Sequence, residues 1–490
     1  MKYFEYILPF ICLGLALIPL AWWRLTVRLR YLQKICKINI MKRQQTLNEP
    51  IFFASLVIDD AVRQLYYGGA AKKAALAALA AGRAQKAAAV LAASCPQLAL
   101  LVAAHADAPR IYRTVKQQRR QWLSHKRYAV FLPVLAQCNY DYAALATQIN
   151  ALAALKLPVI ARPYAALAAA YAYLQEADML SASQSVQKAL KAFQKQQYNT
   201  EEAWCYVATA EIYRLSCVND IAATMLESAL KIYQKQQNNR AIAETVAAQG
   251  MLMLFANRFA EAEECYRKAL TLAPTLRLTA DINNQIALLQ IAQKQYRPAQ
   301  TAVNKALTLH QRCHNRRGEA FSLQLLGQIA FDEAHYSKAA RLSMQAAAIY
   351  QRQHNYAAWC ESLYTAANAH CHRQQYAAGE RLLRQILNIC RQHPSSFHAA
   401  TAYSLLGLIY MQRHEWQRAK VLLQQSLHLE QKNQRCPGLA ADYANLALVE
   451  AVRGDNESAA DNLQIAREYA RQTADAELLA LIEEKISVQD

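Results

Sequence analysis

A unit of about 40 residues recurs through the last two thirds of this chain of 490 residues, and it constrains the fold more than any other feature. A small residue marks the same point of each unit. The eight markers are Ala170, Ala210, Gly250, Ala287, Gly327, Ala367, Gly407 and Ala447. The interval between successive markers is constant except for the slightly shorter step from Gly250 to Ala287. Such a period is typical of stacked supersecondary units, so we look for the function on a surface.

Each unit has the pattern of two antiparallel helices. Tyr403, Leu406 and Tyr410 are spaced by three and four residues, which predicts one apolar helical face. A polar break at 412–415 precedes a second helix, which opens with a bulky residue and carries a second small residue twelve positions after the marker. The bulky residue recurs as Phe259, Tyr296, Tyr336, Tyr376 and Trp416. The two small residues of a unit, such as Gly407 and Ala419, are expected where its helices cross.

This pattern resembles the tetratricopeptide repeat (TPR), whose helix A carries an aromatic residue, Leu-Gly and Tyr, and whose helix B carries an aromatic residue and two alanines. The resemblance covers about residues 160–475. It implies an all-α fold, a right-handed α-solenoid of helix-turn-helix repeats. The basic TPR period is about 34 residues, so the longer period of this chain resembles the longer-helix variants of the family.

We divide the chain into four parts on this basis. Residues 1–46 are expected to hold a membrane anchor and a basic juxtamembrane helix, and 161–473 the eight repeats. Residues 474–490 are amphipathic and fit a C-terminal capping helix. Residues 47–160 are rich in alanine and read as a degenerate TPR-like region; the alternative is a separate small helical domain.

The amino terminus carries a long apolar stretch. Residues 6–23 are uncharged and end in Trp22-Trp23, which favours one transmembrane helix with tryptophans at the interface. A cleaved signal peptide is the rival interpretation, but the basic residue Lys2 is balanced by Glu5 and the apolar run leads into Trp-Trp-Arg. The expected arrangement is a single-pass protein of a bacterial inner membrane.

Seven lysines and arginines follow the span before the first acid, Glu49. The positive-inside rule then places the amino terminus outside and the repeats in the cytoplasm. Residues 25–41 also form a basic amphipathic pattern that suits an anionic leaflet, although the same charges could serve only to fix the topology. The net charge of +19 is therefore explained without nucleic acid, for which no recognition motif is present.

No catalytic motif is found: the chain has no P-loop, GxGxxG, HExxH or GxSxG sequence. Its twelve cysteines are scattered at apolar helical positions and lack CxxC spacing, which favours a reducing compartment. The best metal candidates, His310, Cys313 and His314, lack a fourth ligand, and the members of the run 370–372 diverge around a helix. We expect no enzyme activity, no cofactor, no metal and no small-molecule substrate.

One span, a basic segment and a TPR array together resemble the bacterial lipopolysaccharide assembly protein B type and, more loosely, the HemY-like proteins. The first type ends in a metal ribbon with two CxxC pairs, whereas no cysteine follows Cys436 here. The resemblance therefore implies the layout but not the lipopolysaccharide role. Two functions remain: a membrane-tethered scaffold that binds a protein or peptide, or a regulatory adaptor that presents a client to a separate membrane enzyme or protease.

The TPR resemblance also implies where such a partner binds. In these arrays the positions three before and one after the marker of helix A face the concave groove. These positions supply amide and phenol groups at Asn284, Gln324, Gln328, Tyr364 and Asn368. Such groups can hydrogen-bond an extended peptide backbone. The alternative is that they are only the solvated concave face.

We predict from the seven basic residues after the span that a reporter fused behind Asp490 lies in the cytoplasm. A carboxyl-terminal fluorescent protein should fluoresce, and a carboxyl-terminal alkaline phosphatase should be inactive. Phosphatase activity from that fusion would contradict the orientation.

Overall fold

The computed structural model describes residues 162–472 except for 176–178, 216–217, 273–275, 313–314, 354, 393–395 and 433–435, together with residues 74, 89–91, 151–152, 154–157 and 159. The predicted span at 6–23, the cap at 474–490 and nearly all of 47–160 lie outside these residues. Within the described part of the chain, no helix is both long and apolar enough to cross a membrane.

Sixteen helices, α12 to α27, fill residues 162–472 of the described part, and they alternate as helix A and helix B of eight repeats. The helices A are α12 (Arg162–Gln175), α14 (Asn199–Leu215), α16 (Asn239–Phe255), α18 (Leu276–Ala292), α20 (Arg316–Asp332), α22 (Tyr356–His372), α24 (Ser396–Gln412) and α26 (Cys436–Val452). The helices B are α13 (Met179–Lys195), α15 (Asn219–Lys235), α17 (Phe259–Leu272), α19 (Tyr296–Arg312), α21 (Tyr336–Arg352), α23 (Tyr376–Gln392), α25 (Trp416–Lys432) and α27 (Asn456–Gln472).

The predicted repeat pattern is confirmed, and so is the α-solenoid. Each of the eight markers lies within a helix A, and five helices B begin at the bulky residue that was predicted to open them, from Phe259 to Trp416. Pro298 lies in the first turn of α19, and Pro437 is the second residue of α26. Both positions suit proline because the first helical turn needs no internal N–H donor.

Local sequence explains where several helices begin. Asn238, Asn315 and Asn355 are N-caps whose side-chain oxygens accept a hydrogen bond from the backbone N–H three residues later. The turn inside a repeat is equally regular. From the third repeat onward it places one residue in the left-handed conformation, seven positions after the marker, and this residue is glycine only at Gly454. The shape of the turn is thus imposed by the packing of the two helices rather than by glycine.

Helices A and B of a repeat touch at the predicted small residues. A methyl group at Gly407 would lie 2.8 Å from Cγ of Leu423, and one at Gly327 would lie 2.7 Å from Oγ of Ser343. A methyl group at Gly250 would lie 2.7 Å from Cε1 of the Tyr266 ring. These distances are shorter than a carbon–carbon contact, so the helices are packed as closely as a hydrogen side chain permits.

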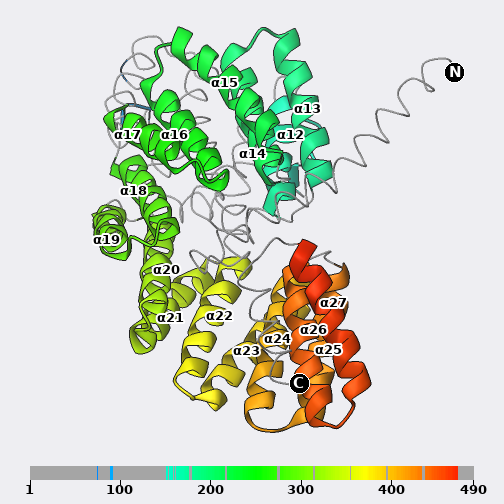
Figure 1. Ribbon diagram of the computed structural model, residues 1–490. Coiled ribbons are helices and arrows are strands. Elements are labelled where there is room, and N and C mark those ends of the chain that lie inside the picture. The colour runs from blue at the N-terminus through cyan, green and yellow to red at the C-terminus, as the bar shows by residue number, and fades with distance from the viewer. Residues whose placement is uncertain are drawn as a thin grey trace, which may run out of the picture.

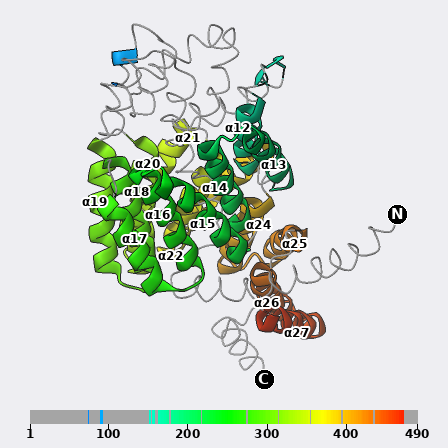
Figure 2. The same ribbon diagram turned by 90° about the horizontal axis from the view of Figure 1, so that it is seen from above.

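The repeats stack into an open arc (Figure 1). The first three repeats lie at the top of that view, α18 to α21 on the left, and the last repeats at the lower right, and the ends α12 and α27 stay apart when the array is seen from above (Figure 2). One core cluster runs from Ala243 to Leu342 and a second from Ala347 to Ile409, so the apolar core continues across repeat boundaries. Burial of this shared surface is what stabilises an array of this kind.

Successive helices A contact one another directly from α16 to α26, whereas no pair of successive helices B in the described residues packs as closely. The helices A therefore line the concave side, as the TPR resemblance implied. The helices B diverge on the convex side and leave grooves that are floored by a helix A.

We predict that replacing Gly407 by leucine destabilises the array. The better helix propensity of leucine is worth up to about 1 kcal/mol, but overpacking against Leu423 costs about 1–3 kcal/mol. Thermal and urea unfolding of the purified full chain should show a net loss of stability. The control is Ala377→Leu, at an exposed position of α23, which should leave unfolding nearly unchanged. Equal melting of the two variants would contradict the close crossing.

Candidate functional site

The predicted groove residues do not form one exposed surface. Asn284 is 2% exposed and Gln324 is 3% exposed. Gln328 is 8% exposed and donates its amide to Asp332 of the same helix at 2.8 Å. Tyr364 and Asn368 of α22 remain partly exposed. Among the five predicted positions, these two are the ones whose side chains reach solvent to a substantial extent.

Asn284 is buried because it connects two repeats. Its Oδ1 accepts a hydrogen bond from Ser322 Oγ at 3.0 Å, and its amide nitrogen lies 3.2 Å from Nε2 of His310. The same geometry recurs three repeats later, where Ser404 Oγ donates to Oδ1 of Asp442 at 2.5 Å. The position three before the marker therefore bonds to the next helix A in these two places. Because of this packing, the side chain at that position is not available in the concave groove.

In the part of the chain that the structure describes, no cluster of three or more potential metal ligands occurs. His310 is completely buried, and Cys313 and His314 lie outside the described residues. His370 contacts Gln375 at 2.8 Å, while His372 stacks on Tyr336 with ring centroids 4.6 Å apart. The two histidines point to different partners, as their helical spacing predicted.

The five cysteines whose side chains the structure describes form no disulfide. Burial raises the pKa of the Cys205 thiol, which therefore stays protonated at neutral pH. Cys360 is buried, and Cys205 and Cys360 pack as the small apolar residues that the sequence indicated.

A pocket of about 590 Å³ lies on the convex side, in the groove between α23 and α25. Its floor is the helix A between them, α24. The lining combines apolar and aromatic groups with three arginines and contains no acidic residue. It consists of Arg384, Leu387, Arg391, Tyr403, Leu406, Tyr410, Gln417, Arg418, Val421, Leu422 and Gln425.

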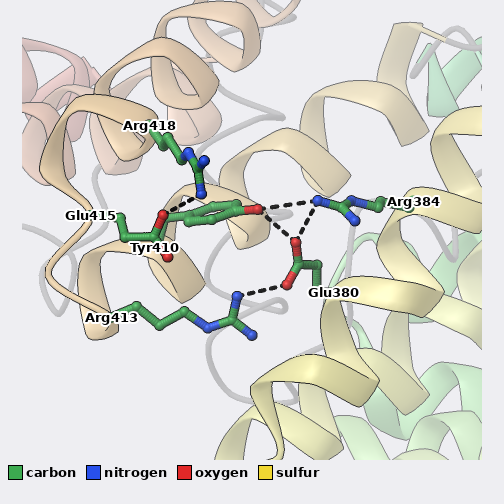
Figure 3. A network of polar contacts seen from close by, with 6 residues as sticks. All are labelled: Glu380, Arg384, Tyr410, Arg413, Glu415 and Arg418. Carbon is green, nitrogen blue, oxygen red and sulfur yellow. Dashed lines mark hydrogen bonds and ion pairs between the residues drawn. The ribbon is translucent and has the colours of Figure 1, made fainter.

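Tyr410 on the floor is held by a network of charged groups (Figure 3). Its hydroxyl donates to Glu380 Oε1 at 2.6 Å and accepts from Arg384 Nη2 at 3.2 Å. Arg413 pairs with the other oxygen of Glu380 at 2.7 Å. The guanidinium groups of Arg413 and Arg418 lie 5.7 and 5.9 Å from the Tyr410 ring centroid, on opposite sides of the ring in Figure 3. The floor is thus fixed before any ligand binds.

The network also sets the charge of its carboxylate. Burial by itself raises the pKa of Glu380, but the hydrogen bonds from Tyr410 and Arg413 and the nearby charge of Arg384 hold that pKa below its ordinary value. The hydrogen bond to Glu380 raises the pKa of the Tyr410 phenol. At neutral pH, Glu380 is therefore an anion and Tyr410 a neutral donor. The side chains of Arg384 and Arg418 are 67% and 70% exposed, so they still face solvent above the floor.

Sequence reasoning missed this pocket. Its arginines belong to two different repeats, and Arg384 and Arg418 lie on separate helices B that are far apart in the sequence. The repeat pattern could have revealed the pocket, because residues at equivalent positions of successive helices B line successive grooves. Comparing those positions repeat by repeat identifies the arginines as a departure from the pattern.

A signal-transduction ATPase (STAND) protein with a tetratricopeptide repeat sensor from Pyrococcus horikoshii superposes with a TM-score of 0.51 at 15% identity, over 71% of this chain and 55% of that one. The chain has the tetratricopeptide repeat fold. It spans about half the length of this ATPase, so the likeness concerns the fold alone.

Two further TPR-like structures superpose less well. The apo form of RapI gives a TM-score of 0.45 at 14% identity, over 76% of this chain and 99% of that one. The PilF protein of Pseudomonas aeruginosa gives 0.37 at 15% identity, over 50% and 97%. No protein-family model matches the chain, and no curated protein matches it.

We predict that His310 makes the stability of the array pH-dependent. Asn315 Oδ1 accepts from the backbone N–H of Gly318, so its amide nitrogen is directed at Nδ1 of His310, 3.2 Å away. That arrangement requires an unprotonated Nδ1. Burial, aided by Arg277, lowers the pKa of His310 from 6.5 to about 3. The unfolded chain therefore binds one more proton than the folded chain between these pKa values.

Stability should accordingly fall as the pH drops through 6.5, by up to about 1.4 kcal/mol per pH unit from this residue. Urea unfolding between pH 7.5 and 5 measures the slope. His310→Gln should unfold more easily at pH 7.5 but with a shallower slope. His428→Gln, on the exposed surface of α25, is the control and should keep the wild-type slope. A slope that is the same in all three proteins would refute the assignment.

Proposed function

We propose that the protein is a membrane-tethered TPR scaffold that binds a protein or peptide partner. The observation that carries the proposal is the stack of eight repeats, α12 to α27, with core clusters that cross the repeat boundaries from the third repeat to the seventh. A continuous core holds side chains from several repeats in fixed relative positions over a long surface. This is what recognition of an extended partner requires. The role is one of binding, and no catalytic step is assigned to the chain.

The tether in this proposal is the apolar segment 6–23, with the amino terminus outside and the array in the cytoplasm. Its support is the apolar length and the seven basic residues that follow. Anchoring would confine the scaffold to two dimensions and raise its effective concentration toward membrane-bound partners.

On the concave side, the contact surface in this proposal centres on α22. Tyr364 and Asn368 lie one helical turn apart and are partly exposed. Asn368 carries both a donor and an acceptor, as the backbone of an extended peptide requires. Asn284, Gln324 and Gln328 are buried and are not part of this contact surface.

The experiment compares partner recovery from detergent-solubilised membranes for three forms of the tagged full chain. Tyr364→Ala with Asn368→Ala should lower recovery of the partners that co-purify with the wild type in fixed stoichiometry. The control is Asn304→Ala with Gln311→Ala, two exposed amides on the convex helix α19. Equal recovery by all three folded forms would exclude the concave surface on α22.

The second candidate, a regulatory adaptor, predicts a different result in the same preparation. An adaptor holds its client transiently, so the client should accumulate on the scaffold only in cells that lack the separate enzyme or protease. Stable neighbours at fixed ratio in unmodified cells favour the scaffold.

A further inference from the structure

The convex groove between α23 and α25 differs from the grooves on either side at the positions of its three arginines. Because the repeats in this part of the chain have the same length, Arg384, Arg391 and Arg418 have direct equivalents in the next groove, which are Gln424, Gln431 and Ser458. The equivalents in the preceding groove are Met344, Gln351 and Ala378. Neither neighbouring groove has a basic residue at these three positions. The arginines are therefore a local addition and not part of the repeat pattern.

The floor of the groove shows the same contrast. The residue equivalent to Tyr410 in the next repeat is Glu450, whose carboxylate pairs with Lys420 at 2.6 Å. That neighbouring groove has a carboxylate in its floor, whereas the lining between α23 and α25 has none. Around this pocket, the four arginines of the lining and network outnumber the carboxylates Glu380 and Glu415 by two. This excess of positive charge is available to bind an anionic ligand.

The arginines are positioned for such a ligand. Arg391 is exposed and has no ion-pair partner among the described residues. Arg384 and Arg418 are anchored at their bases by Glu380 and Glu415 but remain about two thirds exposed. A guanidinium group has five N–H donors, so one carboxylate partner leaves donors for a second. Three such groups surround one recess.

An apolar surface lies between the arginines. Tyr403, Leu406 and Leu422 line the recess, and Val421 beside them is 44% exposed. An occupant of this site therefore offers both anionic groups and an apolar group between them. The volume of about 590 Å³ is large enough for one bulky side chain and its flanking backbone.

We propose that this pocket is a second binding site of the protein, which takes a short acidic segment of a partner protein with one large apolar or aromatic side chain. The carboxylates bind Arg384, Arg391 and Arg418, and the apolar side chain enters between Leu422 and Val421. The site is separate from the concave surface on α22 and does not depend on it.

The dimensions favour a peptide over other anionic partners. A helix of 17 residues is about 25 Å long, which matches about seven residues of extended chain. A nucleic acid binds along a row of basic groups. In both neighbouring grooves, however, neutral residues stand at the positions equivalent to the three arginines, so the row does not continue. A membrane surface is flat and favours projecting basic side chains, whereas this site is recessed between two helices.

The test uses the full-length protein in detergent and a fluorescein-labelled peptide probe, Ser-Glu-Asp-Phe-Glu-Asp-Ser with blocked ends. Binding by fluorescence anisotropy is expected at low ionic strength and should weaken at least threefold between 50 and 300 mM salt. Two control peptides carry Gln and Asn in place of the acids, or Ser in place of Phe. Each should bind at least fivefold more weakly, since each lacks one of the two recognised features.

The protein variants replace arginines by the residues of the next groove, Arg391→Gln with Arg418→Ser, and keep the contacts of Glu380 with Arg384, Tyr410 and Arg413. Probe affinity should fall at least tenfold while the melting curve stays unchanged. The matched control removes the same charge from the neighbouring convex helix α21, with the exposed residues changed as Arg341→Gln and Arg352→Gln. This control should bind the probe within twofold of the wild type.

Three results would overturn the proposal. The first is an equal loss of probe binding in the two double arginine variants, and the second is the absence of probe binding to the folded wild type. The third is that phosphatidylglycerol vesicles or oligo(dT) bind through Arg391 and Arg418 while the peptide does not bind. Tyr364→Ala with Asn368→Ala should leave probe binding unchanged. A loss there would place the peptide on the concave side, so failure of this site and failure of the concave scaffold give different outcomes.

Discussion

The close crossing of helices A and B is the constraint on which the rest of the array depends. At Gly407, Gly327 and Gly250 the partner helix lies within 3 Å of where a methyl group would be. Side-chain volume therefore fixes the distance between the two helices, and a fixed distance makes each repeat a rigid block. Stacking of similar blocks then determines the curvature of the arc and the separation of its surface side chains.

Curvature gives the two faces of the array different chemistry. On the concave side the helices A are pressed together, and polar groups such as Asn284 and Ser404 bond to the next repeat. On the convex side the helices B diverge, so the floor of a groove is open to solvent unless side chains fill it. The pocket between α23 and α25 exists for this reason. Its floor is kept in place by Glu380, which holds Tyr410 and Arg413 together.

The repeat fold could be read from the sequence because each repeat presents the same markers at the same spacing. Even the first residues of helices B, such as Tyr336 and Trp416, followed from the pattern. The concave site could not be predicted equally well. A position that faces the groove in a general TPR scheme is buried here at Asn284, because its exposure depends on how closely two successive helices A approach. That distance depends on packing between repeats, which the pattern within one repeat does not record.

Helix α17 differs from every other helix B, because it ends at Leu272 after 14 residues whereas the others have 17. The missing three residues remove nearly one turn from the convex side of the boundary between the third and fourth repeats. The apolar core still crosses this boundary through α16 and α18. In a linear array, stability depends on the couplings between neighbouring repeats, and α17 packs less extensively against the next helix A than the longer helices B do. Under mechanical load or thermal stress, the array would therefore separate first into a block of three repeats and a block of five, hinged on the helices A.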